Sequence, residues 1–297
     1  MLLNGVAVED TFAEAFAMFG ARVLITAESE KWGMAAARAM TGFATSVIGC
    51  KCEAGIERTV PAAETPDGRP GVSVLLFSTS VESVGKRLVE RVGQCVMTCP
   101  TTACYNALAG EATVVVGGLL RYFGDGFQAA KLIDGRRFWR VPAMDGEFIV
   151  EERFGVQPAI GGGNLLILGE DSAPTLAATE AAVEAMRSVP GVILPFPDGV
   201  VRCGSKVGSR YKTVVASTND AYCPTLRAVS GATRLGDDVN CVLEIVIDGL
   251  DLASIEEAMR RGMKAAARPG VRQITAGNYG GNLGQYKIGL RGLLNGT

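Results

Sequence analysis

The chain has 297 residues, of which 48% are hydrophobic and 20% charged, and its net charge is -2. This composition is typical of a well-packed globular protein, and no apolar run approaches the roughly 18 residues needed to span a membrane. The basic residues are scattered along the sequence, which argues against a nucleic-acid partner because such partners require a clustered basic surface.

The sequence contains eight cysteines and no histidine. Without imidazole, Ser-His-Asp triads, Cys-His dyads and most zinc sites are excluded, and we expect no metal site. Acid–base chemistry must therefore use Glu, Asp, Lys, Tyr or Cys. No CxxC pair occurs, and Cys95 and Cys99 come nearest to a redox pair. We interpret the cysteines as small buried residues of a cytoplasmic protein, because thiols stay reduced there and no export signal is present.

The first half of the chain predicts two successive β-α-β patterns. Ala21–Ser29 is strand-like, a helical segment follows it, and Phe43–Cys50 is predicted to be the next strand. The segment "ETPDGRPG" (Glu64–Gly71) is interpreted as turn chemistry, with Pro and Gly where a turn needs them. The pattern then resumes with the strand "VSVLLFST", the helix "VESVGKRLVERVG" and the strand "QCVMTC".

The second half repeats this order. Asn164–Glu170 precedes a helix with an apolar stripe, and after the strand "PGVILPF" a long insertion leads to "CVLEIVID". A second helix and the strand "PGVRQITAG" complete the pattern, and both helices end before Pro-Gly-Val. The sequence therefore predicts an α+β fold of two ferredoxin-like (split βαβ) lobes from an internal duplication, with insertions.

The two lobes are predicted to cover residues 1–146 and 147–297, with the glycine-rich connection from Tyr105 to about Gly146 at their boundary. A ferredoxin-like sheet carries its helices on one face only. Its other face must be covered by another lobe or by another subunit, which predicts an oligomer.

Glu244 is an acid in the middle of the apolar strand "CVLEIVIDGL". Strand alternation places it on one face with Val242 and Val246, and Ile245 and Ile247 on the other. Burial of an unpaired carboxylate raises its pKa. Glu244 is therefore either a solvated or salt-bridged surface acid, or a desolvated general acid/base, and the strand pattern leaves both alternatives open.

The sequence contains two glycine clusters, "GGGN" (Gly161–Asn164) and "AGNYGGNLGQY" (Ala276–Tyr286). A phosphate-binding loop needs a strand before its glycines and a helix after them. The second cluster follows a strand but leads into no helix, so a nucleotide site is not favoured. Its glycines are interpreted as permitting a positive φ or a close approach of the backbone to a flat ligand. With Asn278 and Tyr279 it is a candidate ligand-lining loop.

The basic segment "PFPDGVVRCGSKVGSRYK" (Pro195–Lys212) has two interpretations. It is either a solvated loop or a cationic lip for an anionic small molecule.

Many blocks along nearly the whole chain, in the same order, resemble those of formylmethanofuran:tetrahydromethanopterin formyltransferases. They include "NGVAVEDTFAEAF", "TGFATSVI", "ETPDGRPGV", "RVGQCVMTCPT", "FGDGFQ", "PFPDGVVR", "STNDAYCPT", "EIVIDGL" and "AGNYGGNLGQY". This resemblance implies reversible formyl transfer between methanofuran and tetrahydromethanopterin, giving 5-formyl-tetrahydromethanopterin, in the one-carbon metabolism of methanogens and methylotrophs. It also implies two ferredoxin-like lobes, a homo-oligomer (typically a tetramer) with its cleft at a subunit interface, and no permanently bound cofactor.

The resemblance places the acid/base or electrostatic role of the family glutamate on Glu244. Amine-to-amine transfer through a tetrahedral intermediate needs proton exchange and oxyanion stabilisation but no covalent nucleophile, which explains the absence of histidine. We expect the substrate-binding residues to be Arg202, Ser205, Lys206, Gln94, Thr98, Thr101, Asn278, Tyr279, Gly280 and Gly281.

Two other hypotheses for the function differ in class. The chain could serve chiefly as a structural or binding subunit of a formyltransferase/hydrolase complex that produces formate. It could instead be a ferredoxin-like sensor that has lost catalysis, although the intact "EIVIDGL" block counts against such a loss.

Overall fold

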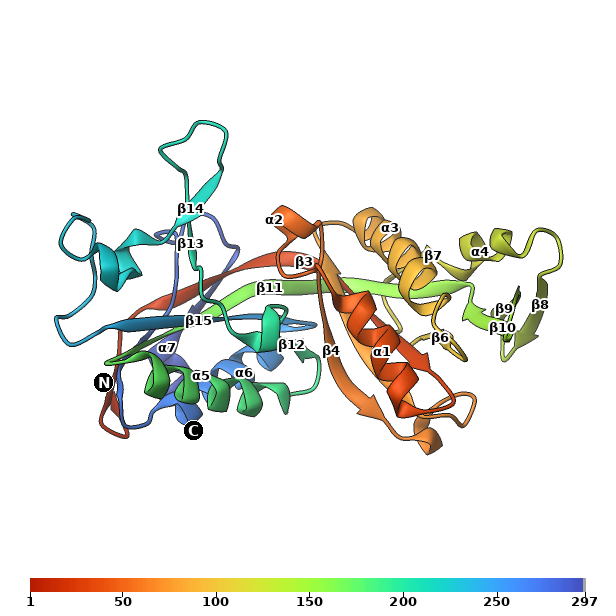
Figure 1. Cartoon of the computed structure of the whole chain (residues 1–297), viewed down its shortest axis with the longest axis horizontal. Helices are drawn as coiled ribbons and strands as arrows, with labels where there is room; N and C mark the ends of the chain where they lie inside the picture. The colour runs from red at the N-terminus through yellow and green to blue at the C-terminus, as the bar shows by residue number, and fades with distance from the viewer. Residues whose placement is uncertain (296–297) are drawn as a thin grey trace. The chain divides into compact units, whose positions relative to one another are not determined.

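The computed structural model describes residues 1–295, which form two compact units (Figure 1). Of the described residues, unit 1 comprises Met1–Ala17, Gly161–Asp248 and 252–295, and unit 2 comprises Met18–Ile160 and Gly249–Asp251. The long strands β3 and β11 contribute residues to both units. The boundary expected between residues 146 and 147 stays a prediction, since these units are defined by packing and their segments alternate along the chain.

Unit 2 contains a β-α-β-β-α-β repeat. Its elements are β3 (Phe12–Thr26), α1 (Glu30–Thr41), α2 (Val47–Cys50), β4 (Glu53–Val60), η1 (Ala62–Glu64), β5 (Gly71–Ser78), α3 (Val81–Arg91), the π-helical turn η2 (Val92–Val96) and β6 (Ala103–Asn106). Strand β5 pairs antiparallel with β3 and β4, and β3 pairs antiparallel with β6. The resulting order β4-β5-β3-β6 is that of a ferredoxin-like sheet.

The core of unit 2 lies between this sheet and its helices. Helix α1 buries Ala36 and Met40, and α3 buries Val84 and Leu88, against apolar strand residues such as Leu76. The spacing of these helix residues keeps them on one face, which is why amphipathic segments form helices here. Every residue of β5 is buried, in keeping with its apolar, β-branched sequence.

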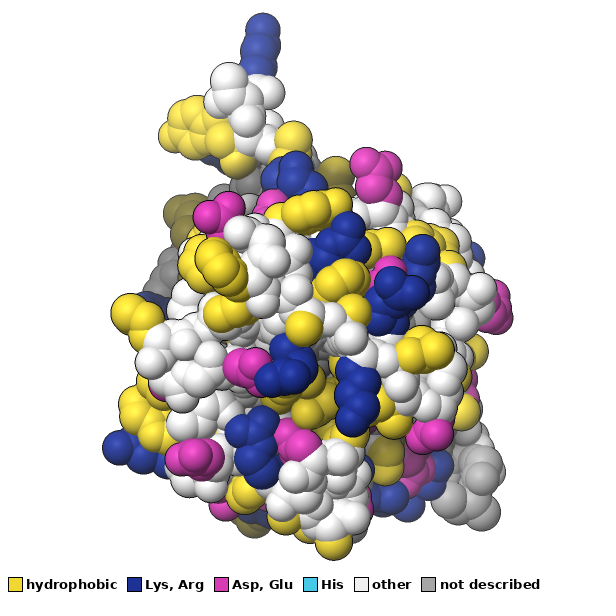
Figure 2. Space-filling view, turned by 90° about the vertical axis from the view of Figure 1, so that its right-hand side faces the viewer, with side chains coloured by type: hydrophobic (Ala, Val, Ile, Leu, Met, Phe, Trp, Pro, Cys, Tyr) yellow, Lys and Arg dark blue, Asp and Glu magenta, His cyan; other side chains and the backbone are white. Residues whose placement is uncertain are grey.

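The remainder of unit 2 carries short elements and a surface hairpin. Its elements are β7 (Ala112–Val115), α4 (Gly117–Leu120), η3 (Arg121–Gly124), β8 (Ala129–Ile133), β9 (Arg136–Ala143), β10 (Gly146–Glu151) and the first part of β11 (Arg153–Gly169). Figure 2 shows the face of the molecule on this side, where basic, acidic and hydrophobic side chains are interspersed. Arginines of β9 pair with acids of the neighbouring strand β10, as Arg140 does with Glu147.

Unit 1 contains the second repeat. Its elements are β1 (Leu2–Leu3), β2 (Val6–Val8), the second part of β11, α5 (Ser172–Arg187), β12 (Val192–Ile193), η4 (Pro197–Gly199), β13 (Ser205–Val207), β14 (Ala216–Thr218), η5 (Asp220–Tyr222), η6 (Pro224–Leu226), β15 (Cys241–Gly249), α6 (Leu252–Ala266), β16 (Val271–Thr275), β17 (Tyr286–Gly289) and α7 (Leu290–Asn295). Strand β15 pairs with β11 and β12, and β11 pairs antiparallel with β16. The order β12-β15-β11-β16 repeats that of unit 2, so the predicted duplication and fold class are confirmed.

The two faces of the unit 1 sheet are covered differently. Helices α5 and α6 pack together on one face, and the hairpin β13–β14 lies on the other side of β11 and β15 (Figure 1). Within unit 1 the second face is partly covered by the chain's own insertion, because Leu235 and Val239 pack on Leu166 and Leu168. The insertion therefore covers part of the sheet face that was expected to be covered by another lobe or subunit.

Two predicted strands are wrong. In Phe43–Cys50 the run of β-branched residues indicated a strand, but Ser46 caps α2 by accepting the Ile48 N–H, and the strand begins at Glu53. The stretch "QCVMTC" is a continuation of α3 into η2 and a turn. Val92 and Val96 are buried at an i, i+4 spacing there.

Among the described residues, no helix is both long and apolar enough to cross a membrane.

Candidate functional site

Glu244 lies in β15 with its side chain on the face opposite the helices. Ile245 and Ile247, its alternating neighbours, are fully buried in the core. The backbone of Val201 pairs with that of Glu244 through two hydrogen bonds of 2.7 and 3.0 Å, so residues around 201–204 lie alongside the strand. Gly204 approaches the carboxylate so closely that a Cβ at this position would lie 2.9 Å from its Oε2 atom.

The environment of Glu244 favours its protonated form. Burial raises the pKa of Glu244 from 4.5 to about 7. Within residues 1–295 its carboxylate makes no hydrogen bond or ion pair that would offset this effect. A carboxyl group with a pKa near neutrality can both accept and release a proton at physiological pH. Of the two alternatives left open by the strand pattern, the desolvated acid is the one that the structure supports.

Glu244 lines a cavity of about 380 Å³ within unit 1. The cavity is formed by β11, β15, the insertion and the loop after β16, and its other lining residues are Asn164, Leu166, Ser205, Lys206, Asn219, Ala221, Tyr222, Ala232, Arg234, Ala276, Gly277, Asn278 and Tyr279. Four of the predicted substrate-binding residues are thus brought together around Glu244.

The basic segment contributes to this site from the base of the hairpin β13–β14. Ser205 and Lys206 line the cavity, and the Lys206 ammonium is paired with Asp220. Hydrogen bonding from Lys206 holds the pKa of the Asp220 carboxyl below its ordinary value. Arg202 is exposed and lines a second, smaller pocket that also touches Glu244. Residues of this segment therefore line both pockets, and its role as a cationic lip for an anionic small molecule stays a prediction.

The loop from Ala276 to Gly284 supplies the opposite wall. The side-chain amide of Asn278 donates to the Thr11 hydroxyl and the Phe12 carbonyl, so it anchors the loop. Burial, and then the charges of Glu244 and Glu14, raise the pKa of Tyr279, whose hydroxyl therefore stays protonated.

Gly280 and Gly281 of the same loop have φ of +71° and +75°, which confirms the predicted need for positive φ, but neither lines the cavity.

The other three predicted binding residues belong to unit 2. Gln94 lies in η2, and the Thr98 hydroxyl donates a 2.7 Å hydrogen bond to the Gln94 carbonyl. Thr101 has φ of +66°, which is unusual for a β-branched residue. The Asp145 carboxylate accepts its N–H, and its hydroxyl accepts the Glu28 N–H.

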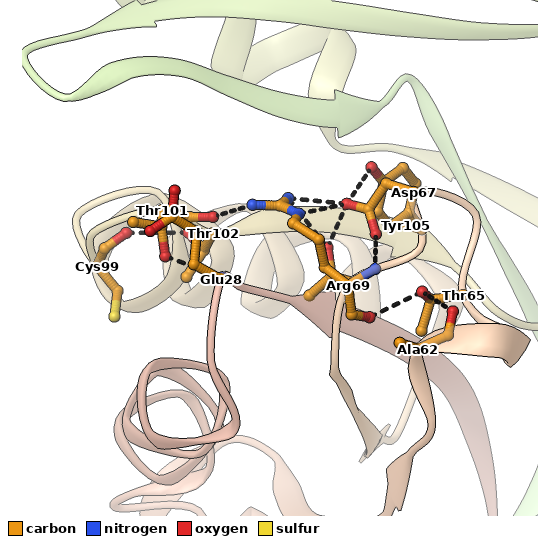
Figure 3. A network of polar contacts seen from close by, with 10 residues as sticks. Glu28, Ala62, Thr65, Asp67, Arg69, Cys99, Thr101, Thr102 and Tyr105 are labelled. Atoms are coloured by element: carbon orange, nitrogen blue, oxygen red, sulfur yellow. Dashed lines mark hydrogen bonds and ion pairs between the residues drawn. The ribbon is translucent and has the colours of Figure 1, made fainter.

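A polar network holds Thr101 in this conformation (Figure 3). The Arg69 guanidinium donates to the Thr101 carbonyl and pairs with Asp67, which also accepts from the Tyr105 hydroxyl. Burial opposes ionisation of Asp67, but hydrogen bonds from Thr26 and Arg69 outweigh it and lower the pKa of this carboxyl. The turn "ETPDGRPG" therefore has the structural role that its composition predicted.

Nine of the lining residues lie outside the predicted set, and two of these, Arg234 and Asn164, carry polar side chains that bear on the site. Arg234 contributes a guanidinium that makes no hydrogen bond or ion pair with the rest of the described chain. In the sequence Arg234 is a single basic residue in a polar loop, and no periodic pattern or cluster of charges around it indicates a binding residue. Asn164 is buried and clamps Gly277 through both atoms of its amide, at 2.6 and 3.0 Å. Its signal was an amide at the start of the apolar segment "NLLILGE".

The arrangement provides proton exchange, hydroxyl and amide donors, and cations at one cavity. Across residues 1–295, no group of three or more His, Cys, Asp or Glu side chains is placed to hold a metal ion. These features define a site suited to acid–base chemistry, centred on one desolvated carboxyl group.

Comparison with known proteins identifies the family. Residues 1–143 match the family described as formylmethanofuran-tetrahydromethanopterin formyltransferase, and residues 146–293 match the proximal lobe of the same family. The formylmethanofuran–tetrahydromethanopterin formyltransferase of Methylococcus capsulatus is 56% identical over 298 residues, which cover 99% of this chain and 100% of the relative.

Two solved structures agree. One is the formyltransferase/hydrolase complex of Methylorubrum extorquens with methylofuran, which has a chain of 52% identity and a TM-score of 0.96, covering 99% of this chain and 98% of that one. The other is the formyltransferase of Methanosarcina barkeri, with 48% identity, a TM-score of 0.94, and coverage of 99% and 100%. The chain belongs to the formylmethanofuran-tetrahydromethanopterin formyltransferase family.

Proposed function

We propose that the chain transfers a formyl group between methanofuran and tetrahydromethanopterin, with Glu244 as the catalytic acid/base. The observation that carries this proposal is the carboxyl group of Glu244, which lines a cavity in the lobe matched as the family's proximal lobe and has a pKa raised to about 7. Methanofuran and tetrahydromethanopterin act as coenzyme substrates, and no prosthetic group is required. A cytoplasmic location and a homotetramer belong to the same proposal.

The reaction proceeds by direct attack. The lone pair of the pterin ring nitrogen forms a bond to the formyl carbon, and the carbonyl π electrons move to its oxygen. The Glu244 carboxylate accepts the proton of the attacking nitrogen. When the oxyanion collapses, the bond to the methanofuran nitrogen breaks, and that nitrogen takes the proton from Glu244. The carboxylate is regenerated, and the same steps run in reverse.

The developing oxyanion needs hydrogen-bond donors that remain protonated. Tyr279 fits this need, because its hydroxyl has a raised pKa and its electrostatic interaction with Glu244 places it near the acid. Arg234 lines the same cavity and supplies positive charge for the anionic parts of the coenzymes, whereas Lys206 on the cavity wall is paired with Asp220. The cavity thus accounts for proton transfer, charge stabilisation and substrate attraction with its own residues.

Replacement of Glu244 tests the proposal. Glu244→Gln keeps the shape of the side chain but removes its proton exchange, so we expect kcat to fall by about 100-fold or more while KM changes little. In the unaltered enzyme the rate should rise as the pH passes through about 7, because the carboxylate is the base, and this limb should be absent in the variant. Formyl transfer between the two coenzymes is measured, with Glu184→Gln, an exposed acid on α5, as the control. Near-normal turnover of Glu244→Gln would refute the assignment.

The second candidate function is that of a subunit in a formyltransferase/hydrolase complex. It is favoured by the likeness to a chain of the Methylorubrum extorquens complex. The purified chain assayed alone distinguishes the two possibilities. Turnover without partners supports an independent formyltransferase, whereas activity that appears only after partner subunits are added supports the subunit role.

A further inference from the structure

Glu14 is a fully buried carboxylate that the reaction described above does not use. It lies in β3 between Ala13 and Ala15, both of which are also fully buried. Its two oxygens accept four backbone N–H groups from the loop after β16. Oε2 accepts those of Tyr279 and Gly281, the latter at 3.0 Å, and Oε1 accepts those of Leu283 and Gly284, both at 2.9 Å.

These four donors keep Glu14 charged in spite of its burial. Burial by itself raises the pKa of a carboxyl group, but the backbone hydrogen bonds from Gly284, Leu283, Tyr279 and Gly281 outweigh it, and the pKa of Glu14 is lowered. A carboxylate that is ionised at neutral pH accepts each bond as a charge-assisted hydrogen bond, which is stronger than a neutral one. The loop is therefore organised around a fixed negative charge.

The same loop forms one wall of the Glu244 cavity, through Gly277, Asn278 and Tyr279. The positive φ of Gly280 and Gly281 lets the chain turn its N–H groups inward. At Gly284 the loop approaches β3 so closely that a Cβ would lie 2.7 Å from the Ala15 carbonyl oxygen.

We propose that Glu14 is a positioning residue, which holds the loop so that Asn278 and Tyr279 form the cavity wall that limits the access of water to Glu244. This inference rests on the proposed function for its catalytic consequence. The geometric part stands on the contacts of Glu14 alone. The Tyr279 backbone bonds to Glu14 while its ring contacts Phe16 at 6.1 Å between centroids, so the carboxylate and the aromatic pair fix the residue from two sides.

Glu14→Gln tests the proposal, because the amide keeps the size but replaces one acceptor oxygen with an NH₂ group that opposes the loop donors. A matched control is Glu151→Gln in unit 2. Glu151 is also buried, accepts the Asn106 N–H at 2.9 Å and pairs with Arg136, but it lines no cavity described above.

We expect Glu14→Gln to lower kcat/KM for formyl transfer by about 10- to 100-fold, because a misplaced wall costs orientation of the substrate. The apparent pKa of the rate profile should also fall from about 7 toward 4.5, since water then reaches Glu244. Glu151→Gln should lose thermal stability but keep the KM values and the pKa. If Glu14→Gln also loses only stability, with unaltered KM and pKa, Glu14 is a structural residue and the proposal is overturned.

A measurement without substrate separates this inference from the proposed function. Hydrogen exchange of the Tyr279, Gly281, Leu283 and Gly284 amides should be slow in the unaltered protein and at least about 10-fold faster in Glu14→Gln, while the amides of β5 keep their protection. Equal exchange in both proteins would overturn the positioning role. Absence of formyl transfer in the unaltered protein would overturn the proposed function. The positioning role of Glu14 would then be decided by the hydrogen-exchange result alone. If Glu14→Gln does not fold, Glu14→Asp takes its place, because the shorter carboxylate keeps the charge but cannot reach all four donors.

Discussion

The half-buried, desolvated carboxyl group of Glu244 has a consequence for stability as well as for catalysis. Its pKa in the folded protein is about 7, whereas its ordinary value is 4.5. The folded state therefore binds this proton more tightly than the unfolded state does, and stability falls as the pH rises from about 4.5 to about 7. Above pH 7 the loss is constant and amounts to at most about 3 kcal/mol.

Glu244→Gln should remove this loss, because the amide carries no charge in either state. We expect the variant to exceed the unaltered protein in unfolding free energy by up to about 3 kcal/mol near pH 8, and by far less near pH 5. Urea denaturation at the two pH values measures the difference. A gain of the same size at both values would mean that the carboxyl group is not desolvated in the folded protein.

At the scale of single residues, the sequence predicted what a local pattern can reveal. Glu244 stood out because an acid interrupted an apolar strand. Glu14 lies in a similar setting, "FAEAF", but its partners are backbone N–H groups more than 260 positions away, which no local pattern records. Arg234 reaches the cavity because of the fold of the insertion, and nothing in its neighbouring residues indicates that fold.

At the scale of elements, the segment from Val201 to Gly204 determines where the Glu244 carboxylate lies. Val201 forms an isolated bridge to the backbone of Glu244, and the Gly204 carbonyl accepts the Asn219 N–H at 3.0 Å. The segment is thus fixed on both sides, and only a glycine leaves room for the carboxylate at its closest point.

Gly204→Ala should displace the carboxylate with little effect on the fold. The added Cβ would lie 2.9 Å from Oε2 of Glu244, the end of a flexible side chain that can move away. We expect kcat to fall by about 10- to 100-fold, since a shift of about 1 Å in a reacting group has this effect, with a change in melting temperature of no more than a few degrees. Gly231→Ala, in the same insertion but with no heavy atom near the new Cβ, is the matched control. Equal turnover of the two variants would show that the position of the carboxylate is not critical.

The elements that the sequence predicted correctly are the core strands and the long helices packed on them, because burial on the sheet gives their sequences a clear apolar pattern. Strands β5 and β15 and helices α1, α3, α5 and α6 all form at the predicted segments, with ends that differ from the predicted ones by no more than about two residues. The strands predicted at Phe43–Cys50 and at "QCVMTC" failed because a Ser46 cap and a π-helical extension of α3 use the same apolar residues in another geometry. In segments this short, the same apolar residues can fit both the alternating pattern of a strand and the i, i+4 pattern of a helix.

At the scale of the whole molecule, the duplication separates two roles. The third strand of each repeat occupies the same position in its sheet, and it is β5 in unit 2 and β15 in unit 1. Every residue of β5 is buried and none is charged, whereas β15 carries Glu244 on its second face. The proposed proton exchange therefore depends on only one of the two equivalent strands, and β5 serves as core.

Leu76→Ala tests this division, because Leu76 is fully buried in β5 within the core of unit 2. Loss of a buried leucine side chain leaves a cavity, and we expect the unfolding free energy to fall by about 2–5 kcal/mol. Denaturant unfolding measures this loss, and kinetics well below the melting temperature should give unaltered KM values and an unaltered apparent pKa near 7. The variant is the converse of Glu244→Gln, which should lose turnover and gain stability. A shift of that pKa in Leu76→Ala would mean that the core of unit 2 controls the environment of Glu244, and the two repeats could then not be assigned separate roles.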